Sequence, residues 1–498
     1  MRYPKKPMLS KSRFIAGLQC PLRLWYQCYN SELATKPPPS QQALFDTGHE
    51  MGKLATSLYT GGVRIEEDYL HHVEAEKSTL NAMSNKNVAA IYEAAFTYSR
   101  IRIRVDILER NDIKTWNLIE VKSSTSVKDV YKPDLGIQYY ILRGLGIDIS
   151  SAGILHINNA YVYDGNQLDL NQLFYFSDFT EETVSRQEEF IFQIKEFKKI
   201  LSWETPPNIR PSKHCMNPYK CEFWEHCTSD MPEFWVMDLS GITQDRFEQL
   251  LELGIEDISE IPDEFPLSAL QERIKKCVTS GQEFTAPELE DELIDVEYPV
   301  HFLDFETFAS AIPRYPNTRP YQTIPFQWSN HILFKDGSIE HTEYLCVEDK
   351  DPCEEFTKAL LETLGTRGTI FIYANYEKRI VNQLADQFLD IRDQLLDFLD
   401  RFKDLHALIR SHYYHPEFYG SFSLKAVLPV LIQSMNYGNL AIQEGRIASL
   451  EYLRMLDPAT PPAKKAKIKH DLLTYCGYDT LAMLKIRDEL LKKMGKFS

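Results

Sequence analysis

Apolar and polar side chains alternate along two neighbouring stretches in the first quarter of the chain. Residues 96–108 and 116–122 are rich in β-branched and aromatic side chains, and a short charged turn separates them. A period of two residues is typical of a strand with one buried face. Residues 135–145 instead repeat their apolar side chains at helical spacing and end around two glycines, Gly144 and Gly146. The pattern therefore predicts two strands followed by a helix.

The rest of the N-terminal region continues this mixture of strands and helices. Further strands are predicted at 153–158 and 161–163, and a long amphipathic helix is predicted at 181–201. Prolines follow this helix and interrupt the pattern. Residues 1–230 are therefore predicted to form one α/β domain.

Two further regions follow. Residues 231–297 carry two short helical patterns and then a run of acidic residues, which predicts a helical connector. Residues 298–498 begin with mostly apolar strands at 300–306 and 324–334, and a buried strand at 369–373 leads into a helix. Helical patterns dominate the remainder, so this region is predicted to be a second α/β domain.

The composition excludes some classes of protein but does not identify a binding partner. The 498 residues are 43% hydrophobic, which is enough to build several buried cores. No apolar run approaches the roughly 20 residues needed to cross a bilayer, and residues 1–7 lack the apolar core of a secretory signal. We therefore expect a cytoplasmic protein without a membrane partner. The net charge of −17 is a sum over the whole chain and leaves room for a local basic surface.

Acidic side chains occupy the first two predicted strands at positions that a metal-dependent hydrolase requires. Asp106 lies in the first strand and Glu120 in the second, followed by Val121 and Lys122. Hard divalent ions prefer oxygen ligands, so the two carboxylates and the carbonyl of Val121 are candidate ligands of Mg²⁺ or Mn²⁺. Lys122 shares a strand face with Glu120, where its ammonium would position water or steady a phosphate. A solvated strand face is the competing interpretation of the same residues.

These strands and the helix after them resemble the PD-(D/E)XK nucleases of the RecB-like branch. The resemblance rests on Asp106, on the Glu120-Val-Lys122 segment and on a Gln138-Tyr-Tyr helix. It implies a restriction-endonuclease-like core in which Gln138 orients the substrate or the lysine. It also implies that His49, in a Gly-His-Glu-Met-Gly segment upstream, is a further metal ligand.

A set of cysteines brackets these acids. Cys215, Cys221 and Cys227 lie in an aromatic-rich segment, and Cys20 precedes the predicted core in the context Cys-Pro-Leu-Arg-Leu-Trp. Nine cysteines do not pair evenly, and a reducing compartment disfavours disulfides. Thiolates are soft ligands suited to zinc or to iron–sulfur clusters, so metal ligation is favoured. Cys28 remains an alternative to Cys20 as the fourth ligand.

The layout of one cysteine before the core and three after it resembles the iron–sulfur nucleases of the RecB-like branch, which include the AddB type and the CRISPR-associated adaptation nucleases. It implies a [4Fe–4S] cluster held by these four cysteines. The spacing between Cys215 and Cys221 is longer than the short pair often seen in those relatives. Zinc is the alternative, with His214 and His226 as additional candidate ligands. The other cysteines are expected to be packing residues: Cys277, Cys346, Cys353 and Cys476.

A second acidic set lies in the C-terminal region. Asp304 and Glu306 share a face of their predicted strand, which suits two divalent ions about 3.5–4 Å apart. Charge in an apolar strand is costly unless it binds something. Far downstream, Tyr475 and Asp479 are spaced as neighbours on one face of a helix. The tyrosine hydroxyl would then orient the attacking water beside the metal.

These residues resemble the DEDD exonucleases of the DnaQ-like, ribonuclease-H-fold superfamily, and the Tyr-x-x-x-Asp spacing matches their tyrosine subclass. The resemblance implies another acid after a strand in the middle of the domain. Glu377 lies at that position, with glutamate where aspartate is usual, and Asp404 is the alternative. Lys425 follows a Gly-Ser-Phe-Ser-Leu segment and is expected either near a substrate phosphate or on an exposed helix face.

The complete layout resembles a bacterial family that joins an iron–sulfur RecB-like nuclease to a DnaQ-like domain. It implies two hydrolytic centres, the second a 3′–5′ exonuclease, with single-stranded or end-containing DNA as the partner. RNA stays open as a substrate, because no pattern in the sequence reads a 2′-hydroxyl. A nucleic-acid-binding scaffold with degenerate centres is the non-catalytic alternative. The sequence also leaves the oligomeric state open.

Overall fold

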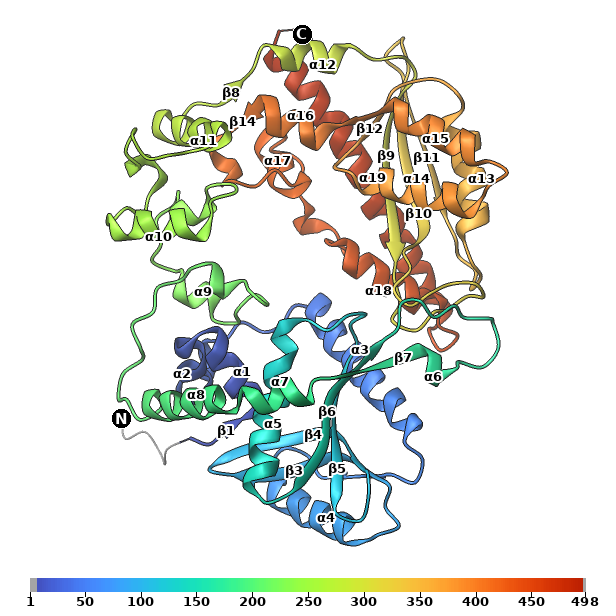
Figure 1. Ribbon diagram of the computed structural model, residues 1–498. Helices are drawn as coiled ribbons and strands as arrows, with labels where there is room; N and C mark the ends of the chain where they lie inside the picture. The colour runs from blue at the N-terminus through green and yellow to red at the C-terminus, as the bar shows by residue number, and fades with distance from the viewer. Residues whose placement is uncertain (1–6, 496–498) are drawn as a thin grey trace. The chain divides into compact units, whose positions relative to one another are not determined.

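The computed structural model describes residues 7–495, so the expectation drawn from residues 1–6 lies outside the described part of the chain. The chain divides into two compact units. The first unit comprises Met1–Asp230 and Ser310–Gln322, and the second comprises Met231–Ala309 and Thr323–Ser498. Each unit is a mixed α/β structure with a central sheet, as the sequence predicts (Figure 1). None of the helices within the described residues combines the length and the apolar character that a membrane crossing demands.

A sheet of seven described strands forms the centre of the first unit. The strands are β1 (Leu9–Ser10), β2 (Val63–Arg64), β3 (Ala90–Tyr98), β4 (Ile101–Arg110), β5 (Thr115–Lys122), β6 (Asp148–Ile157) and β7 (Phe174–Asp178). Their order is β2-β3-β4-β5-β6-β7, and β1 pairs with β4. β3, β4 and β5 form an antiparallel meander, whereas β6 lies parallel to β5. The helix between those two parallel strands makes a β–α–β crossover.

Helices cover both faces of this sheet. Leu118 and Ile154 belong to one core, whereas their chain neighbours Ile119 and Leu155 belong to a second. Successive residues thus face opposite layers, which is the strand period seen in the sequence. The helices of this unit are α1 (Lys11–Gln19), α2 (Pro21–Tyr29), α3 (Pro39–Ala55), α4 (His72–Ser84), α5 (Lys132–Gly144), α6 (Leu170–Leu173), α7 (Thr180–Ser185), α8 (Gln187–Ile200) and α9 (Trp224–Cys227).

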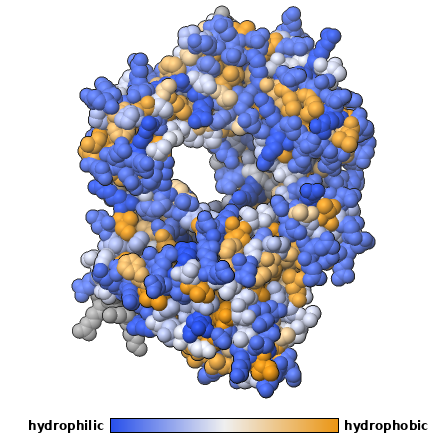
Figure 2. All heavy atoms as spheres, in the orientation of Figure 1, coloured by the Kyte–Doolittle hydropathy of each residue, from blue (hydrophilic) through white to orange (hydrophobic). Residues whose placement is uncertain are grey.

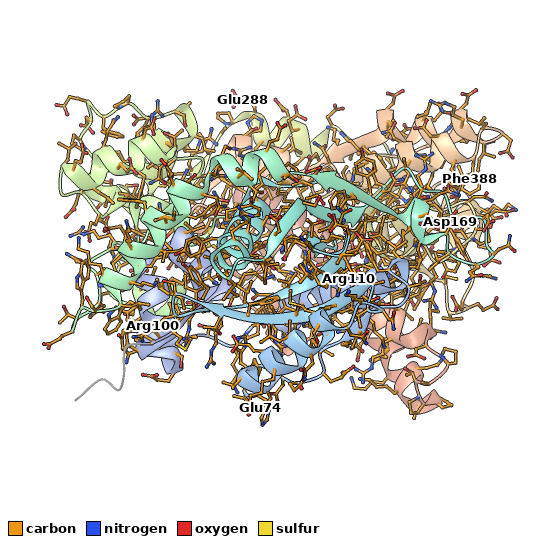
Figure 3. The ribbon with its side chains drawn as sticks, turned by 60° about the horizontal axis from the view of Figure 1, so that its bottom comes forward. Glu74, Arg100, Arg110, Asp169, Glu288 and Phe388 are labelled. Carbon is orange, nitrogen blue, oxygen red and sulfur yellow. The ribbon has the colours of Figure 1, made fainter. Side chains whose placement is uncertain are left out.

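The strand predicted at 96–108 is wrong in one respect, because the segment contains a tight turn between β3 and β4. Ser99 and Arg100 occupy this turn with φ of 48° and 63°. Left-handed backbone is usually marked by glycine or asparagine, so this Ser-Arg pair carries no recognisable turn signal. Figure 3 labels Arg100 at the turn and Arg110 at the far end of β4.

Two other predicted elements also differ. Residues 161–163 form no strand, and β7 takes the place beside β6. Tyr163, the last residue of that segment, accepts a backbone hydrogen bond from Asn317 at 2.7 Å and donates one to Thr318 at 3.0 Å. The backbone of this segment is therefore hydrogen-bonded to a distant part of the chain. The helix predicted at 181–201 is interrupted at Arg186 into α7 and α8. Apolar spacing continues across the interruption and does not reveal it.

A sheet of five described strands forms the centre of the second unit, in the order β11-β10-β9-β12-β13. The strands are β9 (Val300–Phe308), β10 (Ile324–Leu333), β11 (Ile339–Leu345), β12 (Ile370–Ile372) and β13 (Phe402–Asp404), and a separate pair is formed by β8 (Phe284–Thr285) and β14 (Tyr413–Tyr414). The first three strands of the order are antiparallel, and the last two run parallel to β9. The apolar strand β9, predicted from sequence, is therefore central.

Helices surround this sheet, and the longest, α19, packs along β9 and β10 (Figure 1). Residues 231–297, predicted as a connector, are helical but pack within the second unit. The amide of Ala286 donates to the carbonyl of His412 at 2.7 Å, and Arg487 donates to the carbonyl of Leu293 at 2.8 Å. The helices are α10 (Gln244–Glu252), α11 (Ala269–Ser280), α12 (Glu288–Ile294), α13 (Cys353–Leu364), α14 (Tyr376–Gln387), α15 (Arg392–Arg401), α16 (Leu405–His412), α17 (Leu424–Leu431), α18 (Gly445–Leu456) and α19 (Pro462–Lys493).

Hydrophilic residues predominate on the molecular face shown in Figure 2, and hydrophobic residues are scattered among them. Scattered apolar side chains are normal on protein surfaces and need no partner to explain them.

Gly136 marks the closest approach of α5 to α8 and provides a test of this packing. A Cβ atom at Gly136 would lie 2.1 Å from ring atoms of Phe190, whereas one at Gly48 on α3 would meet nothing within 4 Å. Gly136→Ala is expected to lower the free energy of unfolding of the first unit by about 1–3 kcal/mol through overpacking. Gly48→Ala is expected to raise it by up to about 1 kcal/mol through helix propensity. Urea unfolding compares the two variants, and equal effects would contradict the packing.

His301, at the start of β9, should make the stability of the second unit depend on pH. Burial, assisted by the charge of Arg401, lowers the pKa of its imidazole from 6.5 to about 4. The unfolded chain therefore binds a proton that the folded chain does not, and the free energy of unfolding should fall by up to about 3 kcal/mol as the pH drops through this window. His301→Asn keeps an acceptor for the Asn330 amide and should flatten the dependence. The control is His470→Asn, at an exposed residue of α19, which should leave this pH dependence unchanged. Urea unfolding at a series of pH values measures the free energy of unfolding of each variant.

Candidate active sites

In the first unit, β4 and β5 separate where the predicted acids lie. The regular ladder ends at the pair Ile107–Ile119, one residue before Asp106 and Glu120 would face each other. Beyond that point the amide of Val121 donates to Oδ2 of Asp106 at 2.8 Å. The carboxylate thus replaces the backbone acceptor that a continuous ladder would supply. The two acids are brought together at the gap between the strands.

Glu120 is the centre of the group. Its side chain is buried and accepts hydrogen bonds from Lys122 at 2.8 Å and from Gln138 at 2.8 Å. Lys11, the first residue of α1, lies 3.0 Å from both carboxylate oxygens. Lys11 also lies 3.8 Å from Oδ1 of Asp106. No feature of the sequence indicated Lys11, which is distant in the chain.

Asp134 is a second member that the sequence analysis missed. Its carboxylate accepts a hydrogen bond from Lys122 at 2.6 Å. Asp134 and Gln138 lie one turn apart on α5, and this spacing is a signal that could have identified the aspartate. Oε1 of the fully buried Gln138 has no hydrogen-bond partner among the described residues. A buried acceptor of this kind suits a donor such as a bound water.

Opposite charges decide which of these carboxyls is ionised. Burial opposes ionisation of Glu120, but Lys11 and Lys122 outweigh it and lower its pKa to about 2. Burial, assisted by the charge of Glu120, raises the pKa of Asp106 to about 7. Burial also opposes the charge on Lys122, yet Glu120 and Asp134 raise its pKa. The group is therefore largely neutralised by its own lysines.

Two further predicted ligands of this centre are His49 and the carbonyl of Val121. His49 is exposed on α3 and belongs to no group of three or more potential metal ligands among the described residues. Its helix packs on the sheet through Met51 and Ala55 instead. Val121 contributes its amide to Asp106, and its carbonyl remains a predicted ligand.

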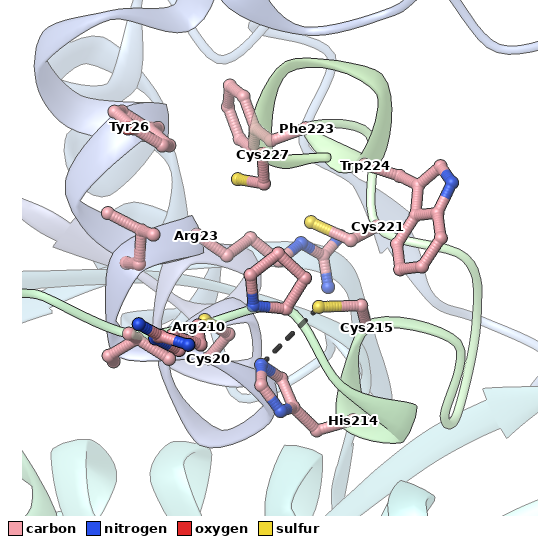
Figure 4. A pocket seen from close by; sticks show the side chains of 13 residues that line it. Cys20, Arg23, Tyr26, Arg210, His214, Cys215, Cys221, Phe223, Trp224 and Cys227 are labelled. Atoms are coloured by element: carbon pink, nitrogen blue, oxygen red, sulfur yellow. Dashed lines mark hydrogen bonds between the residues drawn. The ribbon is translucent and has the colours of Figure 1, made fainter. Parts of the chain in front are cut away.

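The four predicted cysteines line one pocket (Figure 4). Cys20 lies at the start of α2, and Cys215, Cys221 and Cys227 lie in the segment that follows the core. The side chain of Gln19 binds that segment by donating to the carbonyls of His214 and Tyr219, at 2.9 Å each. Two distant parts of the chain are thus joined around the pocket.

The surroundings narrow the choice of ligands. Cys28 packs against the main core, and His226 packs against Tyr26, so neither lines the pocket. His214 does line it, with Nε2 at 3.4 Å from Sγ of Cys215. Within residues 7–495, no three of the cysteine sulfurs come within 4.8 Å of one another. Thiolates around one zinc ion would lie about 3.8 Å apart, so the spacing is wider than a tetrahedral zinc site.

In the second unit, three predicted acids form a compact group. Oxygen atoms of Asp304, Glu306 and Asp479 all lie within 4.8 Å of one another, and this is the one such group within the described residues. The first two carboxylates project from one face of β9, because they are two residues apart. The third comes from α19, which packs on that strand. Local strand and helix periodicity together create the site.

Glu377 lies beside this group, whereas Asp404 has a different role. Glu377 is buried in the first turn of α14, and its charge acts on both Asp304 and Glu306. Asp404 caps α16 by accepting from the amide of Ala407 at 3.1 Å, and it accepts from Ala374 at 3.0 Å. Glu377 therefore acts on the acidic group directly, whereas Asp404 acts on Glu377, whose pKa its charge helps to raise.

Two further residues contact the acids directly and were not predicted to do so. The hydroxyl of Tyr437 donates to Oδ1 of Asp479. Cys476, which the sequence analysis treated as a packing residue, lies with its sulfur 3.4 Å from Oδ2 of Asp304. Its place on α19 three residues before Asp479 is the signal that could have identified it, because residues three apart are neighbours on a helix.

Burial dominates the electrostatics of the second group, and repulsion between neighbouring carboxyls adds to it at Asp304 and Glu306. Burial raises the pKa of Glu377 to about 8 and that of Asp479 to about 6. Burial and the neighbouring acids also raise the pKa values of Asp304 and Glu306. The ammonium of Lys425 lies 6.0 Å from the ring centroid of Tyr475, and its charge opposes the rise in the pKa values of Glu306 and Asp479 without overcoming the effect of burial. Hard oxygen donors with this unmet demand for positive charge fit Mg²⁺ or Mn²⁺.

The second site overlaps a recurrent domain. A family model described as "Domain of unknown function (DUF2779)" matches residues 301–423. The matched stretch includes Asp304, Glu306 and Glu377 and ends before α19. No curated protein matches the chain. The chain is therefore similar to this family over β9 to the segment before α17, and the match assigns no activity.

Proposed function

We propose that this protein is a metal-dependent nuclease with two hydrolytic centres that act on single-stranded or end-containing DNA. The proposal is carried by the buried group of Asp304, Glu306 and Asp479, whose oxygens lie within 4.8 Å of one another. Divalent ions held by such a group activate water and offset the charge that develops on a phosphate. Glu377 at its side and Tyr475 one helical turn before Asp479 fit the DEDD pattern of the tyrosine subclass.

The sheet topologies support the proposed fold families. In the second unit, three antiparallel strands continue into two parallel ones, which supports a ribonuclease-H-like, DnaQ-like domain. In the first unit, an antiparallel meander, a helix and a parallel strand support a PD-(D/E)XK core. Both arrangements place two of the acids on central strands, Asp106 and Glu120 on β4 and β5 and Asp304 and Glu306 on β9, where neighbouring strands fix their positions.

At the second centre, each side chain has a proposed task. Asp304, Glu306 and Asp479 would hold the ions, and Glu377 would complete the acidic set. The hydroxyl of Tyr475 would orient the attacking water, as the resemblance implies for a 3′–5′ exonuclease. Tyr437 would fix the carboxylate of Asp479, because its hydroxyl already donates to it. Lys425 would meet a phosphate of the substrate.

At the first centre, Asp106 and Glu120 would be the ligands of the ion. Lys122 would steady the phosphate or position water, and its contact with Asp134 at 2.6 Å holds it in place. Gln138 would orient Glu120 through its 2.8 Å hydrogen bond and offers its free oxygen to water. These residues carry the proposal for the first unit.

The cysteine pocket would hold a [4Fe–4S] cluster with a structural task. Cys20, Cys215, Cys221 and Cys227 would each supply one thiolate, since each lines the pocket. Burial raises the pKa of each thiol, so a positively charged metal group is needed for them to ionise. The cluster would tie the start of α2 to the segment after the core.

Substitution of one acid at each centre should separate two nuclease activities. Asp304→Asn is expected to lower 3′–5′ degradation of labelled single-stranded DNA in Mg²⁺ or Mn²⁺ by about a hundredfold or more, because a metal ligand is lost. Asp106→Asn is expected to lower the residual cleavage, and the double variant to abolish both. Controls with exposed turn carboxylates, Asp112→Asn and Asp336→Asn, should cleave like the wild type.

Three results would argue against this function. Equal nucleotide release by the wild type and the double variant would exclude both centres. Faster degradation of RNA than of DNA in parallel assays would reassign the substrate. Binding of DNA without cleavage under any divalent ion would favour a scaffold.

Metal content and colour test the cysteine pocket. Protein purified without oxygen is expected to be brown and to contain about four iron atoms per chain. Cys215→Ser should lose the iron and the visible absorption, because one of the four thiolates is gone. Cys28→Ser should keep both, since Cys28 lies outside the pocket. Zinc without iron in the wild type would contradict the cluster.

A further inference from the structure

Lys11 occupies the position between the two acids of the first centre where a cation would bind. Its ammonium lies 3.0 Å from each oxygen of Glu120 and 3.8 Å from Oδ1 of Asp106. No other described lysine pairs with both carboxylates, because Lys122 pairs with Glu120 and Asp134. The side chain is therefore not an ordinary surface ion pair.

The backbone around Lys11 is fixed by contacts of its own. Leu9 and Ser10 pair with β4 at Ile101 and Arg102, four residues before Asp106 and in the same strand. The hydroxyl of Ser10 caps α1 by accepting from the amide of Arg13 at 3.2 Å. Strand pairing and helix capping together deliver the side chain of Lys11 to the acids.

The two centres therefore differ in charge balance. The first contains two lysines in contact with three carboxylates, within 4.0 Å. The second contains a carboxylate group without any lysine at that distance among the described residues. A divalent ion at the second centre meets unbalanced negative charge, whereas one at the first centre must compete with an ammonium.

We propose that Lys11 is an internal counter-ion. Its ammonium occupies the metal-binding position of the first centre and must leave when a divalent ion binds. An ammonium and a divalent ion cannot share the same oxygens at contact distance, because their repulsion is strong away from water. The side chain of Lys11 is 23% exposed and has four rotatable bonds, so it can swing to solvent while its backbone stays paired. This inference rests on the proposed metal site of the first unit.

The consequence is weak ion binding at the first centre, which substitution of Lys11 relieves. Binding of Mn²⁺ would be measured by the electron paramagnetic resonance of the free ion, in full-length protein that carries Asp304→Asn and Asp479→Asn to silence the second centre. In that background, Lys11→Met is expected to tighten binding by about tenfold or more, which corresponds to about 1.4 kcal/mol. Lys11→Arg keeps the charge and should keep the weak affinity.

Lys132→Met is the matched control. Lys132 is also 23% exposed and also pairs with two carboxylates, Asp129 at 3.1 Å and Glu182 at 3.0 Å, but these lie outside the centre. Its substitution should leave the affinity for Mn²⁺ unchanged, and circular dichroism would show that each variant is folded.

Each outcome separates this inference from the proposed function. Tighter binding in Lys11→Met that disappears when Asp106→Asn is added supports both. Measurable but equal or weaker binding in Lys11→Met overturns the role of Lys11 and leaves the metal site standing. An absence of Mn²⁺ binding in all of the folded variants overturns the metal site and, with it, this inference.

Discussion

Carboxylates that are brought together away from water repel one another, and both centres of this protein depend on how that repulsion is met. In the first unit, two lysines and a glutamine surround Glu120 and compensate its charge within the fold. In the second unit, the acids on β9 and α19 receive a hydroxyl from Tyr437, while burial raises their pKa values. The charge of the first group is compensated by lysines of the protein, whereas the second group requires a cation from solution.

Central strands make this crowding possible. β9 has partners on both edges, so Asp304 and Glu306 are held by a framework that does not depend on the acids themselves. In the first unit, the sheet opens at Asp106, and the freed amide of Val121 binds the carboxylate. The cost of placing charge in a core is borne by the stability of the rest of the fold, and the neighbouring ladder keeps the acids in position. Such preorganisation is what a metal-dependent hydrolase needs, because the ligands must be in place before the ion arrives.

The sequence predicts well what depends on local periodicity. The i, i+2 spacing of Asp304 and Glu306 and the i, i+4 spacing of Tyr475 and Asp479 follow from strand and helix geometry, and the structure brings the three acids together with Tyr475 beside Asp479. The central strand β9 and the helix α5 were also predicted and are confirmed. The four cysteines lie on two segments that are linked by hydrogen bonds. That they would meet was predicted from the layout of the cysteines along the chain, and not from strand or helix periodicity.

What the sequence could not show depends on contacts between distant segments. Lys11 reaches Glu120 only because β1 pairs with β4. A strand of two residues is too short to be predicted from the local sequence. Tyr437 meets Asp479 from a 3-10 helix of three residues, Tyr437–Asn439, which is too short to show a periodic pattern in the sequence. His49 stays a predicted ligand, since its side chain is exposed on α3 while neighbouring apolar residues hold the helix on the sheet.

The first unit is not continuous in the chain, since it takes in Ser310–Gln322 after the opening strand of the second unit. Ala311 joins a core with Leu155, and the hydroxyl of Tyr321 donates to the carbonyl of Ser123, beside Lys122. A ribosome delivers the chain from its N-terminus, so this unit is finished only after β9 has been synthesised. The two units must therefore mature in an interleaved order. A gene fragment that stops at the apparent boundary near residue 230 would encode an incomplete fold.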